Sequence, residues 1–165
     1  MIDRRRAFAY MAFMCLGSAI AQSPPPATEA ALREVFHRYE QAWNRHDVQA
    51  WAAFLCADVW FTQAWDSYER QKGRDNAVAL FESNFKDSDL TWEVLGLRTM
   101  PDGTVTVKLH HVLSYLPKVD GKYRLVFDKA PVVSRWRLED GQWRMFFFTS
   151  DKGWALDLLK KDGLE

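Results

Sequence analysis

The sequence lacks an excess of charge of either sign, because its 22 Lys and Arg residues balance its 22 Asp and Glu residues. Domains that bind nucleic acid carry a basic patch, so we expect no nucleic-acid partner. The sequence also lacks a glycine-rich phosphate loop, a serine nucleophile elbow and a dinucleotide-binding fingerprint. Its four histidines do not have the spacing of metal ligands. These absences predict a protein without a metal or a cofactor.

Long hydrophobic runs are missing too, except for a short one at the N-terminus. Three arginines precede an apolar run from Ala7 to Ile20, which is too short to span a bilayer comfortably. The small residues of Ala19-Ile20-Ala21 form a cleavage signal. We therefore predict a signal peptide over residues 1–21, cleaved before Gln22, and a proline-rich spacer over residues 22–28.

Such a leader predicts that the mature chain is periplasmic or secreted and is not attached to a membrane. The Sec route is favoured, and the Arg5-Arg6 pair leaves the twin-arginine route open. An uncleaved N-terminal anchor is the alternative. Cleavage removes Cys15 and leaves Cys56 alone, which excludes an intrachain disulfide. A lone cysteine in an apolar segment is expected to be an inert core residue.

Aromatic residues, by contrast, are abundant: the chain has 11 Phe, 8 Trp and 5 Tyr. Many of them fall at the spacing of buried helix or strand faces. The pattern predicts helices over 28–44, after Asp47, over 75–85 and over 153–161, and strands over 59–65, 90–98, 104–115, 123–138 and 143–149. This order predicts one α+β domain in which three N-terminal helices pack on a curved antiparallel sheet, with a pocket between them.

Three segments carry a resemblance to a known family. They are Tyr39–Asp47 (YEQAWNRHD), Gly73–Ala77 (GRDNA) and Ser134–Met145 (SRWRLEDGQWRM). In order and spacing they resemble the nuclear transport factor 2-like (NTF2-like) superfamily, which includes SnoaL-like and ketosteroid-isomerase-like proteins, and most closely its DUF4440-type branch. The resemblance covers residues 29–151 and leaves residues 152–165 as a short helix and tail. It implies a cone-shaped half-barrel with a ligand cavity, and a homodimer formed through the outer sheet.

The resemblance also implies positions for a catalytic set. The oxyanion tyrosine of ketosteroid isomerases matches Tyr39, the base position falls on Gln63, and the partner acid falls near Ser134. Glutamine is no proton base at neutral pH, and serine is a weak replacement for a protonated carboxyl. A shift of a few residues would offer Asp66 as the base instead. A complete acid–base set of that type is therefore not recognised.

His111 is another candidate catalytic residue. Strand alternation places it on the inward face, together with Val107, Leu109 and Leu113. Both His111 and Tyr39 have a structural alternative, because a single histidine on an apolar face and a tyrosine on a helix stripe are common core residues.

Four further residues are expected to line the concave side and bind a ligand: Trp43, Gln63, Trp65 and Ser134. Together with Tyr39 and His111 they offer hydrogen bonds and aromatic walls without a strong acid–base pair. The sequence therefore predicts that a small, partly apolar ligand binds in the cone cavity. Two alternatives stay open. One is a cofactor-free isomerase, dehydratase or hydrolase that uses Tyr39 with His111 or Asp66, and the other is a protein-interaction module that uses the outer sheet face.

The last predicted strand, over 143–149, is apolar on both faces. Alternation places Phe146 and Phe148 on one side, which we expect to be the outer one, and Trp143, Met145 and Phe147 on the other. An outer apolar face needs a cover. A second copy in a symmetric homodimer would supply it, as would the C-terminal helix through Trp154 and Leu158.

Overall fold

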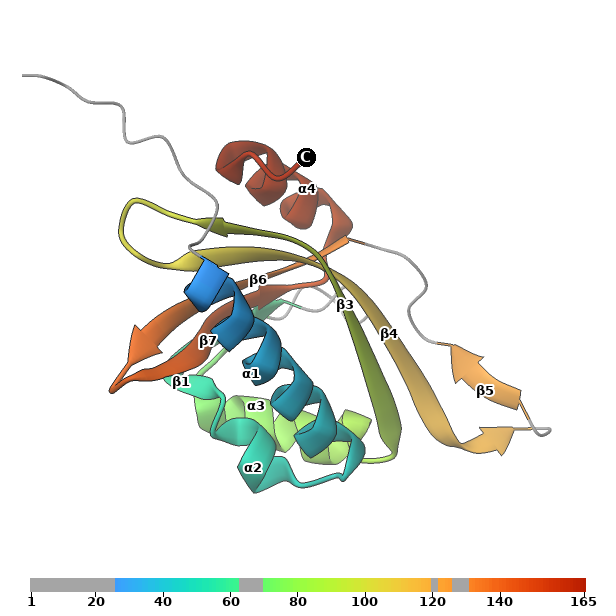
Figure 1. Cartoon of the computed structure of the whole chain (residues 1–165). Coiled ribbons are helices and arrows are strands. Elements are labelled where there is room, and N and C mark those ends of the chain that lie inside the picture. The colour runs from blue at the N-terminus through green and yellow to red at the C-terminus, as the bar shows by residue number, and fades with distance from the viewer. Residues whose placement is uncertain (1–25, 63–69, 120–121, 126–130) are drawn as a thin grey trace, which may run out of the picture.

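The computed structural model describes residues 26–62, 70–119, 122–125 and 131–165. The predicted leader, most of the spacer and the predicted site residues Gln63, Trp65 and Asp66 lie outside this part of the chain. Helices α1, α2 and α3 cover one face of a curved sheet, and α4 lies on the other face (Figure 1). The predicted α+β arrangement is confirmed. None of the helices in the described ranges combines the length and the apolar character that crossing a membrane requires.

The helices begin and end close to the predicted positions. α1 spans Pro26–Asn44, α2 spans Val48–Ala52, α3 spans Arg74–Leu80 and α4 spans Lys152–Asp162. α3 continues as a π-helical turn, η1, over Phe81–Phe85, so the helix expected over 75–85 changes its hydrogen-bond pattern halfway. Asp47 caps α2, because its Oδ1 accepts a hydrogen bond from the backbone N–H of Ala50 at 3.0 Å.

The described strands form one mixed sheet. They are β1 Leu55–Thr62, β2 Arg70–Lys72, β3 Ser88–Thr99, β4 Val105–Val119, β5 Lys122–Leu125, β6 Pro131–Glu139 and β7 Gln142–Thr149. Their order is β2-β1-β7-β6-β4-β3, and β5 pairs with β4 beside this path. Every pair is antiparallel except β1 with β7, which is parallel. The described parts of the strand expected over 123–138 are β5 and β6, which both pair with β4.

The stripe predicted on α1 is buried against the concave face of the sheet, where it forms part of the core: Leu32, Val35, Phe36, Tyr39 and Trp43. Phe36 packs edge-to-face against Trp136 of β6, with ring centroids 5.0 Å apart. The amphipathic spacing of this helix therefore positions Tyr39 and Trp43 in the interior.

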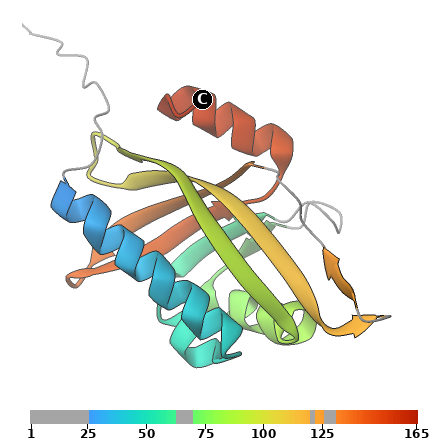
Figure 2. The ribbon, with the colours of Figure 1, turned by 45° about the vertical axis from the view of Figure 1, so that its right-hand side comes forward.

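Polar side chains of α1 bind the backbone of β3, which is an edge strand (Figure 2). Asn44 accepts a hydrogen bond from the N–H of Leu90 at 2.6 Å and donates one to the C=O of the same residue at 2.9 Å. Glu40 Oε2 accepts a hydrogen bond from the N–H of Trp92 at 3.0 Å. Because these side chains replace the missing partner strand, they fix the backbone of Leu90 and Trp92.

A β-bulge at Phe146 changes the face of the sheet toward which the side chains at the end of β7 point. Trp136 of β6 pairs with Met145, but the preceding residue pairs with Phe147, so Phe146 has no partner of its own. Phe148 is buried on the concave side, and Phe147 packs edge-to-face against Trp154 of α4 at 5.7 Å. The prediction that Phe148 lies on the outer face is wrong, because the extra residue reverses the alternation.

α4 covers the outer face of the sheet. Its residues Ala155 and Leu159 are buried against Val133 of β6. The Asp162 carboxylate is 2% exposed and accepts a hydrogen bond from the Arg135 guanidinium at 2.7 Å. The C-terminal helix thus supplies a cover for this face within the chain, and the homodimer stays a prediction.

Candidate functional site

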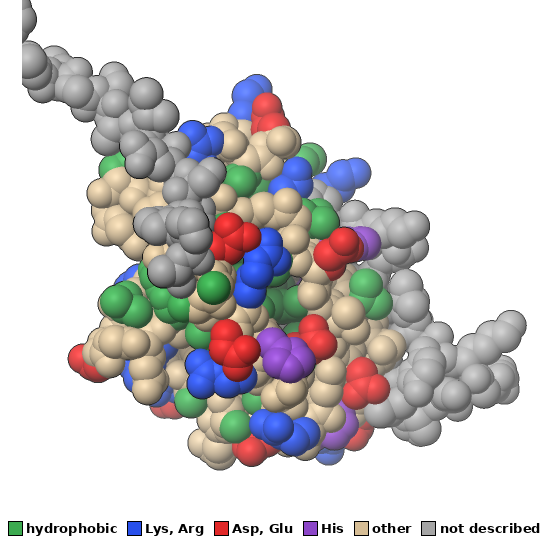
Figure 3. Space-filling view, in the orientation of Figure 1, with side chains coloured by type: hydrophobic (Ala, Val, Ile, Leu, Met, Phe, Trp, Pro, Cys, Tyr) green, Lys and Arg blue, Asp and Glu red, His purple; other side chains and the backbone are tan. Residues whose placement is uncertain are grey.

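A cavity lies between the helices α1, α2 and α3 and the concave face of the sheet. Its volume is about 40 Å³. The described lining residues are mostly aromatic or aliphatic: Tyr39, Trp43, Trp51, Phe61, Ala77, Leu80, Leu90, Trp92, His111, Leu113, Met145, Phe148 and Ser150. None of these carries a carboxylate, an ammonium or a guanidinium group. On the outside, acidic and basic side chains are interspersed on the face shown in Figure 3, without a patch of one sign.

Tyr39 is both a core residue and a wall residue of the cavity. Its ring stacks on Trp92 with centroids 4.3 Å apart and meets Trp51 at 6.0 Å, edge to face. Burial raises the pKa of the Tyr39 phenol well above its ordinary value, and a side-chain hydrogen bond with Trp51 lowers it by a smaller amount. The phenol is therefore protonated at neutral pH and offers an O–H donor.

His111 lies on β4 and is 7% exposed. Its ring meets Trp92 at 6.2 Å and Phe148 at 5.8 Å, both edge to face. Burial lowers the pKa of His111 from 6.5 to about 3, because the apolar surroundings disfavour the charged ring. At neutral pH, placing a proton on this ring costs about 5 kcal/mol. His111 is therefore a neutral polar group and a poor general base.

Two polar atoms of the wall are buried without a hydrogen-bond partner in the described part of the chain, Nε1 of Trp92 and Oγ of Ser150. Ser150 is 3% exposed, so bulk water does not solvate its hydroxyl. By contrast, the Trp51 side chain is hydrogen-bonded to Tyr39, and the Nε1 of Trp43 donates a hydrogen bond to Ser88 Oγ at 3.2 Å. Buried polar groups are paired in most native structures, so the two atoms of Trp92 and Ser150 stand out in the described part of the wall.

The structure brings together three of the predicted site residues: Tyr39, Trp43 and His111 all line the cavity. Ser134 does not line it, because its fully buried Oγ accepts a hydrogen bond from Trp136 Nε1 at 2.9 Å within the core. Gln63, Trp65 and Asp66 lie outside the described residues.

Sequence reasoning did not place Trp51, Trp92 and Ser150 in the site. The helix and strand spacings place both tryptophans on inward faces, but this signal does not separate a cavity wall from filled core. No local pattern marks Ser150, since it follows the bulge that redirects the end of β7.

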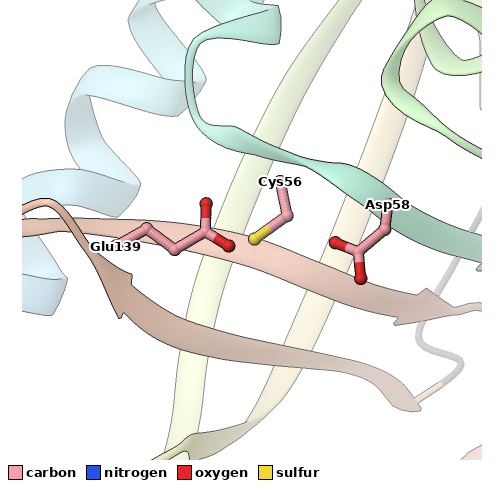
Figure 4. Close-up of side chains that lie close together, drawn as sticks. All are labelled: Cys56, Asp58 and Glu139. Carbon is pink, nitrogen blue, oxygen red and sulfur yellow. The ribbon is translucent and has the colours of Figure 1, made fainter.

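The side chains of Cys56, Asp58 and Glu139 lie close together in a second cluster (Figure 4), and none of them lines the cavity. Their candidate ligand atoms are within 4.8 Å of one another. The Arg137 guanidinium binds both carboxylates, with 2.7 Å to Asp58 Oδ1 and 2.7 Å to Glu139 Oε1. These hydrogen bonds lower the pKa of both carboxyl groups, and burial raises the pKa of the Cys56 thiol to about 12. Arg137 thus supplies the cation of an ion-pair network that includes both carboxylates of this cluster.

Solved structures of low sequence identity share this fold. Aln2 from a Streptomyces species is 13% identical, with a TM-score of 0.65 over 78% of this chain and 92% of its own. A conserved protein from Planctomyces limnophilus is 19% identical, with a TM-score of 0.63 over 74% of this chain and 94% of its own. An NTF2-like protein of unknown function from Pseudomonas putida is 16% identical, with a TM-score of 0.59 over 76% of this chain and 86% of its own. At such identities the likeness shows the NTF2-like fold alone.

The curated proteins include no match to this sequence. The family that describes SnoaL-like domains does match, over residues 36–145 of the 165-residue chain. This range holds α1 from Phe36 onward and most of the sheet, and it includes Tyr39, Trp43 and His111. The resemblance to SnoaL-like proteins read from the three sequence segments is thereby confirmed, and the chain belongs to the SnoaL-like domain family.

Proposed function

We propose that this protein binds a small, partly apolar ligand in the cavity between α1, α2, α3 and the sheet. The observation that carries the proposal is an open volume of about 40 Å³ inside an aromatic wall, because protein cores contain few voids larger than a water molecule. Leaving such a volume empty costs about 1 kcal/mol of stability, at roughly 24 cal/mol per Å³. A ligand that fills it recovers this cost and adds contacts with the wall.

The size of the cavity limits the ligand. A site of this volume holds about three waters, since each water needs roughly 10–15 Å³. A compound the size of one five-membered ring therefore has to displace wall side chains. Leu80 and Trp92 are only half-buried, so they are the wall residues that can move most easily.

Binding without catalysis is the function that the wall chemistry favours. Tyr39 and His111 are the titratable side chains among the described lining residues, and burial keeps both of them neutral. A general base has to accept a proton near the working pH, which His111 does not do. The described wall therefore supplies hydrogen bonds and apolar contact rather than proton transfer.

A cavity-filling variant tests the proposal. Ala77 of α3 is buried and lines the cavity, whereas Ala79 on the same helix is exposed. We expect the wild type and Ala79→Leu to bind cyclopentane and cyclopentanone in a ligand-observed NMR titration, and Ala77→Leu to bind both at least about tenfold more weakly because leucine occupies the open volume. Absence of binding to the wild type, or equal binding to Ala77→Leu, would contradict the proposal.

The proposal also includes export of the mature chain. It is supported by the sequence alone: the arginines before Ala7, the short apolar run and the Ala19-Ile20-Ala21 signal. The N-terminal residue of the protein recovered from expressing cells tests it, with Gln22 as the expected result and Met1 as the result that would contradict it.

A further inference from the structure

The end of β7 and the residue after it alternate between the cavity and the outer face of the sheet. Phe148 and Ser150 line the cavity. Phe147, directly before Phe148, packs edge-to-face against Trp154 of α4, with ring centroids 5.7 Å apart. Trp154 also meets Trp60 of β1 at 6.3 Å. A short stretch of chain therefore carries both a part of the cavity wall and a part of the surface on which α4 rests.

α4 follows this stretch almost without a connection. Asp151 is the one residue between Ser150 and the helix, and its Oδ1 caps α4 by accepting a hydrogen bond from the N–H of Trp154 at 2.7 Å. The N–H of Asp151 donates to Thr149 Oγ1 at 3.2 Å. The N–H of Ser150 donates to the C=O of Thr62 at 3.1 Å. Because the cap and the backbone are joined in this way, a displacement of the start of α4 also displaces Ser150.

Cations from β3, β4 and β6 bind the other end of α4. Each donates a hydrogen bond to a residue at or just after the C-terminus of the helix: Arg135 to the Asp162 carboxylate at 2.7 Å, Arg98 to the Gly163 carbonyl at 2.6 Å and Lys108 to the Leu164 carbonyl at 3.2 Å. Cations at this end stabilise a helix, because its last carbonyl groups lack partners within the helix. None of these three cations is among the described residues that line the cavity. α4 is therefore held at both ends, and only its start adjoins the cavity wall.

We propose that α4 positions part of the cavity wall from the opposite face of the sheet. The three cations hold α4 on the outer face, and α4 holds the end of β7, so that Phe148 and Ser150 lie where a ligand contacts them. This inference rests on the proposed ligand-binding function and adds a part of the chain that controls it from outside the cavity. α4 follows the range 36–145 that matches the SnoaL-like family, so the family match assigns it no role.

Asp162 is the residue at which the attachment of α4 is weakened for the test. Its carboxylate binds Arg135 and does not line the cavity, so Asp162→Ala loosens α4 and leaves every described lining residue unchanged. Asp157→Ala is the matched control, because Asp157 is exposed on the same helix. Two quantities are measured. They are the dissociation constant of cyclopentane, from ligand-observed NMR, and the rate of hydrogen exchange of the α4 backbone amides with and without cyclopentane.

We expect Asp162→Ala to bind cyclopentane at least about threefold more weakly than the wild type, and Asp157→Ala to bind it as the wild type does. A substitution that only lowers stability leaves the affinity of the folded protein unchanged, so weaker binding reports a displaced wall.

Coupling between two sites is reciprocal, so saturating cyclopentane should slow amide exchange in α4 of the wild type at least about threefold. The cavity-filled variant Ala77→Leu should show no such slowing. Wild-type affinity in Asp162→Ala, or exchange in wild-type α4 that cyclopentane does not slow, overturns the inference, while cyclopentane binding to the wild type leaves the proposed function standing. Failure of cyclopentane to bind the wild type overturns the proposed function as well.

Discussion

Replacing the buried His111 with glutamine is expected to remove a large part of the acid sensitivity of this fold. The imidazole is 7% exposed on β4 and lies against Trp92 and Phe148. Glutamine keeps a polar side chain at this position but cannot titrate. The variant therefore isolates the effect of protonating His111 from the effect of losing a polar group.

The sign and the size of the effect follow from the pKa of His111. Burial lowers it from 6.5 in the unfolded chain to about 3 in the folded protein. Above pH 6.5 the ring is neutral in both states and has no effect. Below that value the unfolded chain binds a proton that the folded protein does not bind, so the free energy of unfolding falls by about 1.4 kcal/mol per pH unit. Lowering the pH by two units, from 6.5 to about 4.5, therefore lowers the free energy of unfolding by about 3 kcal/mol.

Urea unfolding at about pH 7.5 and about pH 4.5 measures this effect. His37→Gln is the matched control, because His37 is exposed on α1 and its Nε2 lies 2.8 Å from Gln41 Nε2. We expect the wild type and His37→Gln to lose about 3 kcal/mol more on acidification than His111→Gln. If His111→Gln loses as much stability as the wild type, His111 is charged or solvated in the folded protein, and the reasoning about a neutral wall is refuted.

Two further predictions concern the contacts that hold the cavity walls and α4 in place. Asn44→Ala removes both hydrogen bonds to the backbone of Leu90 and should lower the free energy of unfolding by about 2 kcal/mol, at about 1 kcal/mol for each bond, in urea titrations. If the free energy of unfolding falls by less than about 0.5 kcal/mol, the hydrogen bonds from Asn44 do not hold β3 against α1. Asp162→Ala leaves Arg135 without its carboxylate partner and should cost about 3 kcal/mol in thermal unfolding, whereas the exposed Asp157 on the same helix should tolerate alanine. Equal effects at the two positions would contradict the assigned role of Asp162.

Much of the fold is accessible from local sequence patterns. The stripe on α1 and the alternation along β4 predict which side chains are buried, because helix and strand periods are local properties. The bulge at Phe146 is not accessible in this way, since it depends on how β7 pairs with β6. Its consequence is that Phe148 faces the cavity and not the outside. The parallel pairing of β1 with β7 is likewise long-range and has no local signal.

The same distinction holds for the candidate site. Periodicity identifies Tyr39, Trp43 and His111, which share the cavity wall. It does not show which partner the indole N–H of each tryptophan has. The N–H of Trp43, for example, is accepted by Ser88, which lies 45 positions later in the chain. Whether a buried donor is satisfied depends on tertiary contacts, and the most informative residues of this site therefore emerge only from the structure.

A crystal structure of the protein soaked with cyclopentanone tests the central claim most directly. We predict that the ketone lies in the cavity beside Tyr39 and Trp43. A cavity that holds only water, or a ketone found only elsewhere on the protein, would contradict the claim.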